Sequence, residues 1–305
     1  MTVRTVSIGA DATASKGWIG AHKWLLVRRA SQLSILALFL LGPWLGIWIV
    51  KGNLNASLAL GVLPLTDPYV LLQTLLTWHV PELTAIIGAL IVLAFYLLAG
   101  GRVYCAWVCP VNMVTDAAHW LRERLGIKGG SRLPRNTRYR YWVLAMTLVL
   151  AVVTGSVAWE LVNPVSMLHR GLIFGMGFAW AIVLAVFMLD LFVSRRAWCG
   201  HLCPVGAFYS LLGHLTPLRV SAVSRDACND CMDCYAVCPE PQVIPPALKG
   251  ADKGIGPVIL AANCTNCGRC IDVCAKNVFV FASRFQNKSG GLGRKSPSQK
   301  MEVMS

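Results

Sequence analysis

Twelve cysteines occur in this chain of 305 residues, and eight of them form two closely spaced runs towards its C-terminal end. Residues 228–239 have the spacing Cys-x2-Cys-x2-Cys-x3-Cys-Pro, and residues 264–275 repeat it with Ala275 in place of the proline. A [4Fe-4S] cube needs four thiolates, and a short loop offers only three of them from one side. The fourth cysteine of each run therefore ligates the other cube, so the spacing predicts two [4Fe-4S] clusters.

This exchange of fourth ligands assigns all eight cysteines. We expect the first cluster site to consist of Cys228, Cys231, Cys234 and Cys274, and the second cluster site of Cys264, Cys267, Cys270 and Cys238. Zinc is the alternative, but a structural zinc site uses paired Cys-x2-Cys units around one tetrahedral ion. Two runs of three cysteines plus one fit that pattern poorly. The sequence therefore favours a two-cluster domain of the bacterial ferredoxin type.

The four remaining cysteines form two pairs with the spacing Cys-x3-Cys-Pro-Val, Cys105 with Cys109 and Cys199 with Cys203. A spacing of four places both members of a pair on one face of a helix, and the following proline marks a local break. Four thiols could converge there on a third iron-sulfur centre or another thiolate-bound metal. A redox-active dithiol and unligated, packed cysteines are the alternatives.

The elements that must position these thiols are apolar. The chain is 56% apolar and only 14% charged, which favours a polytopic membrane protein. Crossing a hydrocarbon core of about 30 Å takes about 20 helical residues. We expect four transmembrane helices, over residues 30–50, 83–101, 141–159 and 171–189. Because Cys-x3-Cys-Pro recurs after the second and the fourth, the fold class is an α-helical membrane protein with two pseudo-related helix pairs and a C-terminal two-cluster ferredoxin domain.

The net charge of +14 is distributed by span rather than gathered on one face, so it indicates topology rather than nucleic-acid binding. Basic residues precede the first span, fill the loop between the second and third, and follow the fourth. By the positive-inside rule, both termini and the ferredoxin domain face the cytoplasm, and residues 51–82 and 160–170 face outwards. The cysteines then lie on the reducing side of a bacterial inner membrane, where structural disulfides are rare.

These patterns divide the chain into four parts. Residues 1–22 have no hydrophobic periodicity and are expected to be flexible, and residues 23–223 form the membrane domain. The cysteine-rich ferredoxin domain follows over residues 224–285. The tail, residues 286–305, is rich in Ser, Gly and Lys and is expected to be disordered.

Residues 16–283 resemble the NapH family, the membrane quinol dehydrogenase subunits of periplasmic nitrate reductase systems. The resemblance rests on the four spans, both kinds of cysteine motif, and the segments GPWLGIWIVKGN and PLTDPYVLLQ. It implies that the protein oxidises a membrane quinol. It also implies that electrons pass, with a periplasmic iron-sulfur partner of the NapG type, towards a c-type cytochrome and nitrate reductase.

Two other functions stay open. A FixG/RdxA-type maturation factor would supply electrons or copper to a metallocentre under assembly, and a scaffold would use its clusters only structurally. Metal analysis distinguishes a maturation factor from a quinol dehydrogenase, because copper at the Cys-x3-Cys-Pro pairs would favour the maturation role.

Quinol oxidation releases two electrons and two protons, so it needs an apolar slot and a group that accepts protons. The sequence offers five candidates near the outward ends of the spans, namely Asp67, His79, Glu82, Glu160 and His169. For Glu82 and Glu160 the alternative is a helix end in water, and a histidine at an interface is usually not catalytic.

Overall fold

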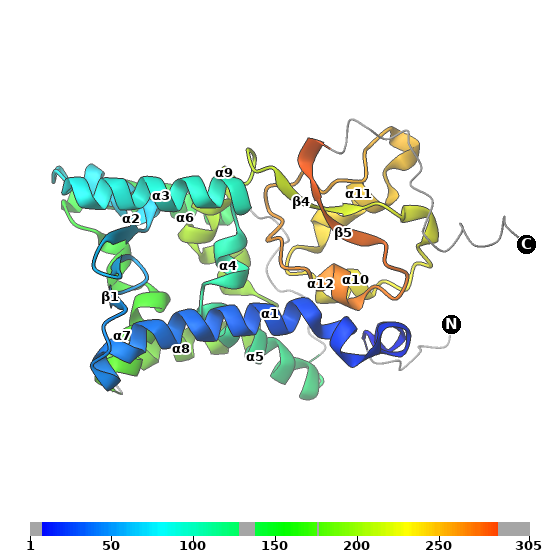
Figure 1. Ribbon diagram of the computed structural model, residues 1–305, viewed down its shortest axis with the longest axis horizontal. Helices are drawn as coiled ribbons and strands as arrows, with labels where there is room; N and C mark the ends of the chain where they lie inside the picture. Colours follow the sequence, from blue (N-terminus) through cyan, green and yellow to red (C-terminus); the bar gives the residue numbers. More distant parts are fainter. Residues whose placement is uncertain (1–7, 128–137, 176, 286–305) are drawn as a thin grey trace, which may run out of the picture.

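The computed structural model describes residues 8–127, 138–175 and 177–285. The expected flexible residues 1–7 and the expected disordered tail 286–305 lie outside these ranges. The chain forms a helical body, residues 8–217, and a C-terminal domain, residues 218–285. The two lie end to end along the longest axis (Figure 1).

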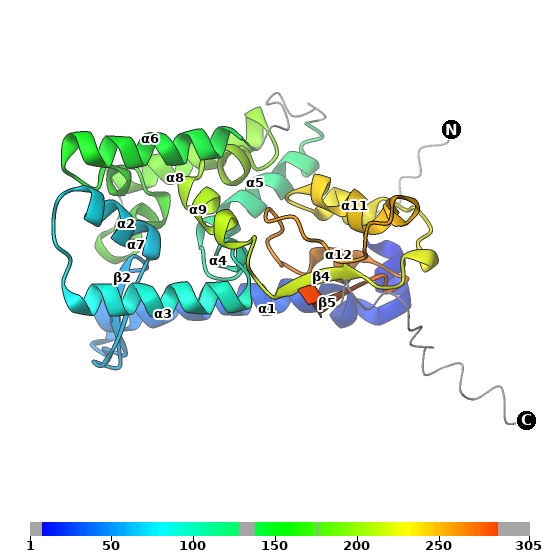
Figure 2. The same cartoon turned by 90° about the horizontal axis from the view of Figure 1, so that it is seen from above.

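Four apolar helices run roughly along this axis (Figures 1 and 2), and they are α1 (Ala10–Leu45), α3 (Leu83–Ala99), α6 (Tyr139–Thr154) and α8 (Phe178–Met188). Within the described residues, α1 alone is long and apolar enough by length and composition to cross a membrane. The other three apolar stretches, Leu83–Ala99, Tyr139–Thr154 and Phe178–Val193, are shorter.

The expected spans differ from these helices at their ends. The first helix begins at Ala10, ahead of the expected span, so residues 10–22 are helical apart from a break at Gly17. Tertiary contacts explain this, since the Lys16 ammonium donates to the carbonyl of Ile271 in the C-terminal domain over 2.9 Å. Residues 171–189 are not one helix. Instead α7 (Pro164–Phe174) ends before Gly175, whose φ of 91° glycine adopts without steric cost.

Shorter elements lie among or at the ends of the long helices (Figure 2). They are β1 (Val50–Gly52), β2 (Ala56–Ala59) and β3 (Leu63–Thr66), which form an antiparallel sheet, together with α2 (Pro68–Leu76), α4 (Val103–Trp107), α5 (Val111–Arg124), η1 (Ala158–Leu161), η2 (Leu189–Val193), η3 (Trp198–Leu202) and α9 (Pro204–Leu212). The sheet and α2 occupy the outer loop of the expected topology.

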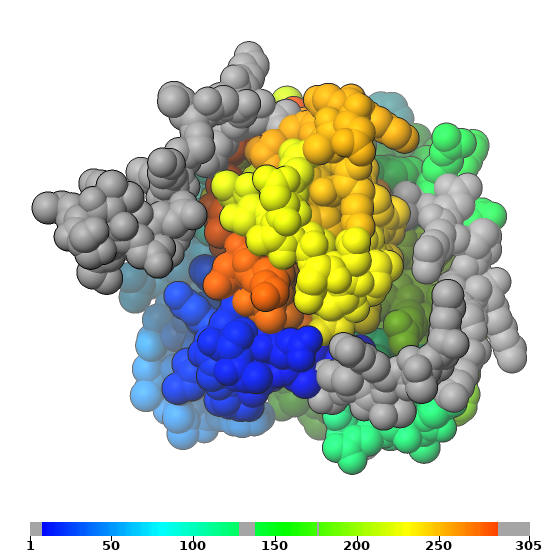
Figure 3. All heavy atoms as spheres, turned by 90° about the vertical axis from the view of Figure 1, so that its right-hand side faces the viewer, coloured from blue at the N-terminus to red at the C-terminus, as the bar shows by residue number. Residues whose placement is uncertain are grey.

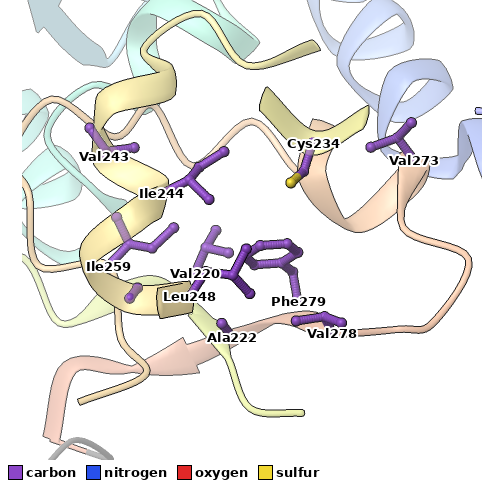
Figure 4. Close-up of a cluster of buried hydrophobic side chains, with 11 residues drawn as sticks. Val220, Ala222, Cys234, Val243, Ile244, Leu248, Ile259, Val273, Val278 and Phe279 are labelled. Carbon is purple, nitrogen blue, oxygen red and sulfur yellow. The ribbon is translucent and has the colours of Figure 1, made fainter. Parts of the chain in front are cut away.

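The first and last segments of the C-terminal domain pair with each other as two strands. Strand β4 (Leu218–Ala222) pairs antiparallel with β5 (Phe279–Ser283), from Leu218 opposite Ser283 to Ala222 opposite Phe279. The domain therefore begins at residue 218 rather than 224. Between the strands lie η4 (Arg225–Ala227), α10 (Asp233–Val237), η5 (Pro241–Val243), α11 (Ile244–Lys249), η6 (Ala251–Lys253) and α12 (Arg269–Val273). Val220, Ile244, Ile259 and Phe279 form its buried core (Figure 4), each contributing about 1.5–3 kcal/mol.

Two buried carboxylates join the domain to the body. Glu240 accepts hydrogen bonds from Arg102 (2.7 Å) and Arg140 (2.9 Å) of the body. Asp116 of α5 pairs with Arg269 of α12 and also with Arg29 and Arg196. Burial raises the pKa of Asp116, but the three guanidinium groups outweigh it and hold that pKa well below its usual range. The N-terminal part of α1 also lies directly against the domain (Figure 3).

Candidate functional site

The eight cysteines of the two runs surround two separate cavities in the C-terminal domain. Cys228, Cys231, Cys234 and Cys274 line one cavity. Cys238, Cys264, Cys267 and Cys270 line the other, with apolar side chains such as Val220 and Ile259. These are the two sets that the exchange of fourth ligands predicts. Four thiols around an otherwise mainly apolar cavity fit a [4Fe-4S] cube, which takes one thiolate at each of its four irons.

Each run folds around its cavity through the same backbone turns. Asp230 and Asn266, two residues after the first cysteine of their runs, have positive φ values of 55° and 47°. Met232 and Gly268, one residue after the second cysteine, also have positive φ, 66° and 73°. Positive φ is uncommon for residues other than glycine. Its recurrence at equivalent positions indicates that both loops are held in one conformation that turns three thiols inwards.

The four cysteines of the Cys-x3-Cys-Pro motifs converge in the helical body. Each of these thiols, Cys105, Cys109, Cys199 and Cys203, interacts electrostatically with the other three. Burial raises the pKa values of Cys109 and Cys199 above their ordinary value, followed by the neighbouring thiols for Cys109 and by the Asp190 charge and then the thiols for Cys199. A buried group of thiolates needs a cation, so this arrangement fits a thiolate-bound metal centre.

Among the residues that the structure describes, no three His, Cys, Asp or Glu side chains are close enough together to hold a single metal ion. At both cavities of the C-terminal domain, the cysteine thiols surround the cavity and do not converge on one point.

The two Cys-x3-Cys-Pro motifs occupy equivalent places in the fold. Each follows a long apolar helix, lies on a short helix, and ends where a proline starts the next helix: α3, α4 and α5 in one case, α8, η3 and α9 in the other. Pro110 directly precedes α5 and Pro204 is the first residue of α9. The thiol of Cys203 caps α9 by accepting from the Gly206 amide over 3.4 Å. The recurrence of Cys-x3-Cys-Pro in the sequence therefore has a counterpart in the structure.

Two contacts join these motifs to the second cluster site. Trp107, between Cys105 and Cys109, donates from its indole nitrogen to the carbonyl of Asn266, between Cys264 and Cys267, over 3.1 Å. Arg102 donates to Glu240, to the carbonyl of Asn263 (2.9 Å) and to the carbonyl of Cys199 (3.4 Å). The two groups of thiols are therefore close neighbours across the junction of body and domain.

A larger cavity of about 260 Å³ lies on the other side of the Cys-x3-Cys-Pro motifs. Its walls are mainly apolar and come from α1, the β1–β3 sheet, α3 and α4. Its polar groups include Asp67 and three tyrosines, Tyr96, Tyr104 and Tyr209. Tyr104 and Val108 line the cavity and directly precede Cys105 and Cys109, so the cavity lies next to that thiol group.

Asp67 is buried at the wall of this cavity, where it caps the N-terminus of α2. Its Oδ1 accepts hydrogen bonds from the Tyr69 amide (3.0 Å) and the Tyr209 hydroxyl (3.1 Å). Burial raises the pKa of Asp67 to about 6, against the effect of these two hydrogen bonds, and the Glu160 charge adds to the rise. A carboxyl with this pKa accepts and releases a proton near neutral pH.

Of the five candidate quinol-site residues, only Asp67 lines the cavity. Glu160 lies within electrostatic range of Asp67 and accepts hydrogen bonds from Asn55 (2.6 Å) and Asn163 (3.2 Å). His169 is buried and packs edge-on against Phe39, a wall residue, with ring centroids 5.7 Å apart. His79 and Glu82 are exposed and do not line the cavity.

Sequence reasoning missed the tyrosines. The rings of Tyr104 and Tyr209 stack with centroids 5.1 Å apart, and Tyr96 packs edge-on against both. All three line the cavity, and Tyr96 and Tyr104 also lie within electrostatic range of the thiols of Cys105 and Cys109. The one local signal was the position of Tyr104 beside Cys105. Nothing near Tyr209 in the sequence indicates that its hydroxyl reaches Asp67, 142 positions away.

Two protein-family models match the segments that carry the thiols. A model described as "4Fe-4S dicluster domain" matches residues 227–288. A second, described as "4Fe-4S binding domain", matches residues 82–128 and 176–221, and so covers both Cys-x3-Cys-Pro motifs. The fold and the sites thus define an iron-sulfur electron-transfer protein of the ferredoxin type, with a helical body.

Full-length relatives identify the family within this class. The methylamine utilization ferredoxin-type protein MauN of Paracoccus denitrificans is 56% identical over 92% of this chain and 98% of its own length. The ferredoxin-type proteins NapH of Haemophilus influenzae and Escherichia coli are 44% and 43% identical, over 92% and 94% of this chain and 96% and 99% of their own lengths. The chain therefore belongs to the family of NapH and MauN ferredoxin-type proteins. No solved structure matches it.

Proposed function

We propose that this protein is a membrane subunit that oxidises quinol in the cavity at Asp67 and passes the electrons through iron-sulfur clusters. One observation carries the proposal. The residues that line this cavity, Tyr104 and Val108, directly precede Cys105 and Cys109, whose thiol group borders the second cluster site. A ligand in the cavity would therefore contact tyrosines that lie within electrostatic range of the Cys105 and Cys109 thiols.

The proposed ligands are the three thiol groups described above. Cys228, Cys231, Cys234 and Cys274 would hold the first [4Fe-4S] cluster, and Cys238, Cys264, Cys267 and Cys270 the second. Cys105, Cys109, Cys199 and Cys203 would hold a third centre, supported by the 4Fe-4S family model that matches both of their segments. When bound, such clusters accept and donate single electrons.

The cavity supplies what quinol oxidation needs from the protein. Its apolar wall accepts a hydrophobic ring and excludes water, and the Tyr209 hydroxyl holds the Asp67 carboxylate towards the cavity. Quinol loses two protons and two electrons in becoming quinone. Asp67 would take the protons in turn, with Glu160 within electrostatic range of it. The adjacent cysteines would hold the clusters that accept the electrons one at a time.

Apolar side chains on the outer faces of the helices support a membrane location. On α3, Leu83, Leu90, Phe95 and Leu98 are exposed, and on α6, Trp142, Val149 and Val153 are exposed. Water disfavours such contiguous apolar faces, and lipid covers them. We infer four spans, formed by α1, α3, α6 and the α8–η2 stretch, in a bacterial inner membrane. The positive-inside rule places the termini and the C-terminal domain in the cytoplasm.

The names of the relatives suggest two electron-transfer systems. The NapH resemblance points to nitrate respiration, with a NapG-type iron-sulfur protein and a c-type cytochrome as partners. The higher identity to MauN, 56% against 44% and 43%, favours methylamine utilization as a second candidate. Deleting the gene tests both, because growth on methylamine or nitrate-dependent anaerobic growth fails according to the system served.

The direct test uses anaerobically purified protein in lipid nanodiscs. A short-chain quinol is added, and cluster reduction is followed by electron paramagnetic resonance. We expect reduction signals that are absent without quinol. If clusters that dithionite reduces stay oxidised with quinol and the redox partner present, the quinol dehydrogenase role is wrong.

A further inference from the structure

Buried arginines gather around the second cluster site and not around the first. Arg28 of α1 interacts electrostatically with the Cys267 thiol, and Arg219 of β4 with the Cys264 thiol. Arg269 lines the cavity itself, and Arg102 bonds to Glu240, another lining residue. Arg28 and Arg219 are each only 1% exposed.

The positions of Arg28 and Arg219 are fixed by packing. Arg28 donates from Nε to the Trp24 carbonyl over 3.2 Å, and the Trp24 ring lies so close to Gly268 that a β-carbon there would come within 2.6 Å of it. Arg219 donates to the Ala261 carbonyl over 3.2 Å and is adjacent in β4 to Val220, a lining residue. Both guanidinium groups are therefore held within electrostatic range of thiols of the second cluster site, although neither lines its cavity.

Neither arginine forms a close ion pair with a carboxylate in the part of the chain that the structure describes, although Asp116 and Asp272 lie within electrostatic range of Arg28. Arg102 is paired with Glu240 and Arg269 with Asp116. Arg28 and Arg219 form no ion pair, and the buried Nη1 of Arg28 and the Nε and Nη2 of Arg219 have no hydrogen-bond partner. A buried cation without a partner is costly. The anionic thiolates of the second cluster site would compensate both charges.

The first cluster site has a different environment. Its Cys231 is exposed, the basic side chains in electrostatic contact with its cysteines are lysines, and Lys276 at its cavity is exposed. Lys16 interacts with Cys274 and donates to the Ile271 carbonyl, and Lys249 interacts with Cys228 but is 49% exposed and paired with Asp230. Solvent screens such charges. The buried positive field therefore belongs to the second site.

Two effects of opposite sign act on a cluster's reduction potential. Reduction adds a negative charge, so burial alone lowers the potential of the second cluster relative to the more exposed first. Fixed positive charges in a medium of low dielectric stabilise the reduced form and raise the potential. Because Arg28 and Arg219 are buried near these thiols and form no close ion pair, we expect the charge effect to outweigh the burial effect.

We propose that Arg28 and Arg219 raise the reduction potential of the cluster held by Cys238, Cys264, Cys267 and Cys270 above that of the cluster held by Cys228, Cys231, Cys234 and Cys274. They are positioning residues that act through charge. The inference rests on the proposed cluster ligands and deepens the proposed function. Quinol is a weaker reductant than the donors of ordinary low-potential ferredoxins, so a cluster of raised potential beside the body is the one that it can reduce.

The test is a redox titration of the anaerobically purified full-length protein, with chemical mediators and without quinol, monitored by electron paramagnetic resonance. We compare Arg28→Gln and Arg219→Gln with Arg28→Lys, which keeps the charge. The matched control is Arg225→Gln, which removes an arginine near the first site. Cys231→Ser identifies the signal of the first cluster.

Arg28→Gln and Arg219→Gln are each expected to lower the reduced-to-oxidised ratio of the second cluster about tenfold at a fixed poise, a 59 mV shift for a one-electron couple. Arg28→Lys should keep the reduced-to-oxidised ratio of the second cluster close to that of the wild type. Arg225→Gln should leave this ratio unchanged. The proposal is overturned if both potentials stay unchanged, if Arg28→Lys shifts as far as Arg28→Gln, or if the shifted signal is the one that Cys231→Ser alters. If a glutamine variant does not assemble, the order of the two cluster potentials in the wild type tests the proposal. Cys231→Ser is then expected to alter the signal with the lower potential.

Because mediators set the potential, this result is independent of quinol. A failure of quinol to reduce the clusters would contradict the proposed function and leave the order of potentials intact.

Discussion

The hydroxyl of Tyr209 donates a hydrogen bond to the carboxylate of Asp67, joining α9 to the N-terminus of α2 over 3.1 Å. Tyr209 lies six residues after Cys203, and Asp67 lines the mainly apolar cavity of about 260 Å³ in the helical body. This bond connects the proposed quinol cavity with the segment that carries a Cys-x3-Cys-Pro motif. The first two predictions depend on it.

Asp67→Asn should slow the reduction of the clusters by quinol about 10²-fold or more, because the amide cannot accept a proton. Cluster content and cluster reduction by dithionite should not change. The rate is measured by stopped-flow absorbance with a short-chain quinol. Glu82→Gln is the matched control, since Glu82 is exposed. Equal slowing by both variants would contradict a specific role for Asp67.

The rate of quinol oxidation should rise with pH through the pKa of Asp67. Burial raises this pKa to about 6, so the carboxyl is largely protonated below that pH and cannot act as a base. Above about pH 7 it is ionised and the rate should level off. Initial rates over about pH 5 to about pH 8 measure the step. The step should be absent from the residual activity of Asp67→Asn, and its persistence would assign it to another group.

Cys203→Ser should remove about four irons per chain, the content of one cube, if the Cys-x3-Cys-Pro cysteines hold a third cluster. All four thiols are in mutual electrostatic contact, so the loss of one leaves a corner of the cube without its ligand, and we expect the whole cube to be lost. Iron and acid-labile sulfide are counted on purified protein. A wild-type iron content equal to that of two cubes, unchanged in the variant, would refute a third cluster. Bound copper would favour the maturation role.

Glu240→Gln should destabilise the junction of body and domain. The side chains of Arg102 and Arg140 are 3% and 0% exposed and both pair with Glu240, so the variant leaves two buried guanidinium groups without a counter-charge. Removing one partner of a buried ion pair costs about 3–5 kcal/mol. Thermal unfolding in detergent, followed by circular dichroism, should show a lower Tm. Lys249→Gln, which breaks an exposed pair with Asp230, should leave Tm unchanged.

The sequence by itself predicted the features that depend on neighbours within a few residues. The spacing of the two cysteine runs was enough to divide eight thiols into the two sets that surround the two cavities, because a short loop limits which thiols can share a cube. Apolar composition located the cores of α3 and α6, and the recurrence of Cys-x3-Cys-Pro anticipated the paired arrangement of α4 and η3.

Only the tertiary structure decided which side chains meet across long separations. It placed Asp67, alone of the five acidic and histidine candidates, at the wall of the large cavity and supplied Tyr209 as its hydrogen-bond partner. It also brought Arg28 of α1 within electrostatic range of the Cys267 thiol. It also made residues 10–22 helical by packing them on α12. The reason is that a local pattern fixes the face of an element, whereas the neighbour on that face depends on how segments more than a hundred residues apart pack together.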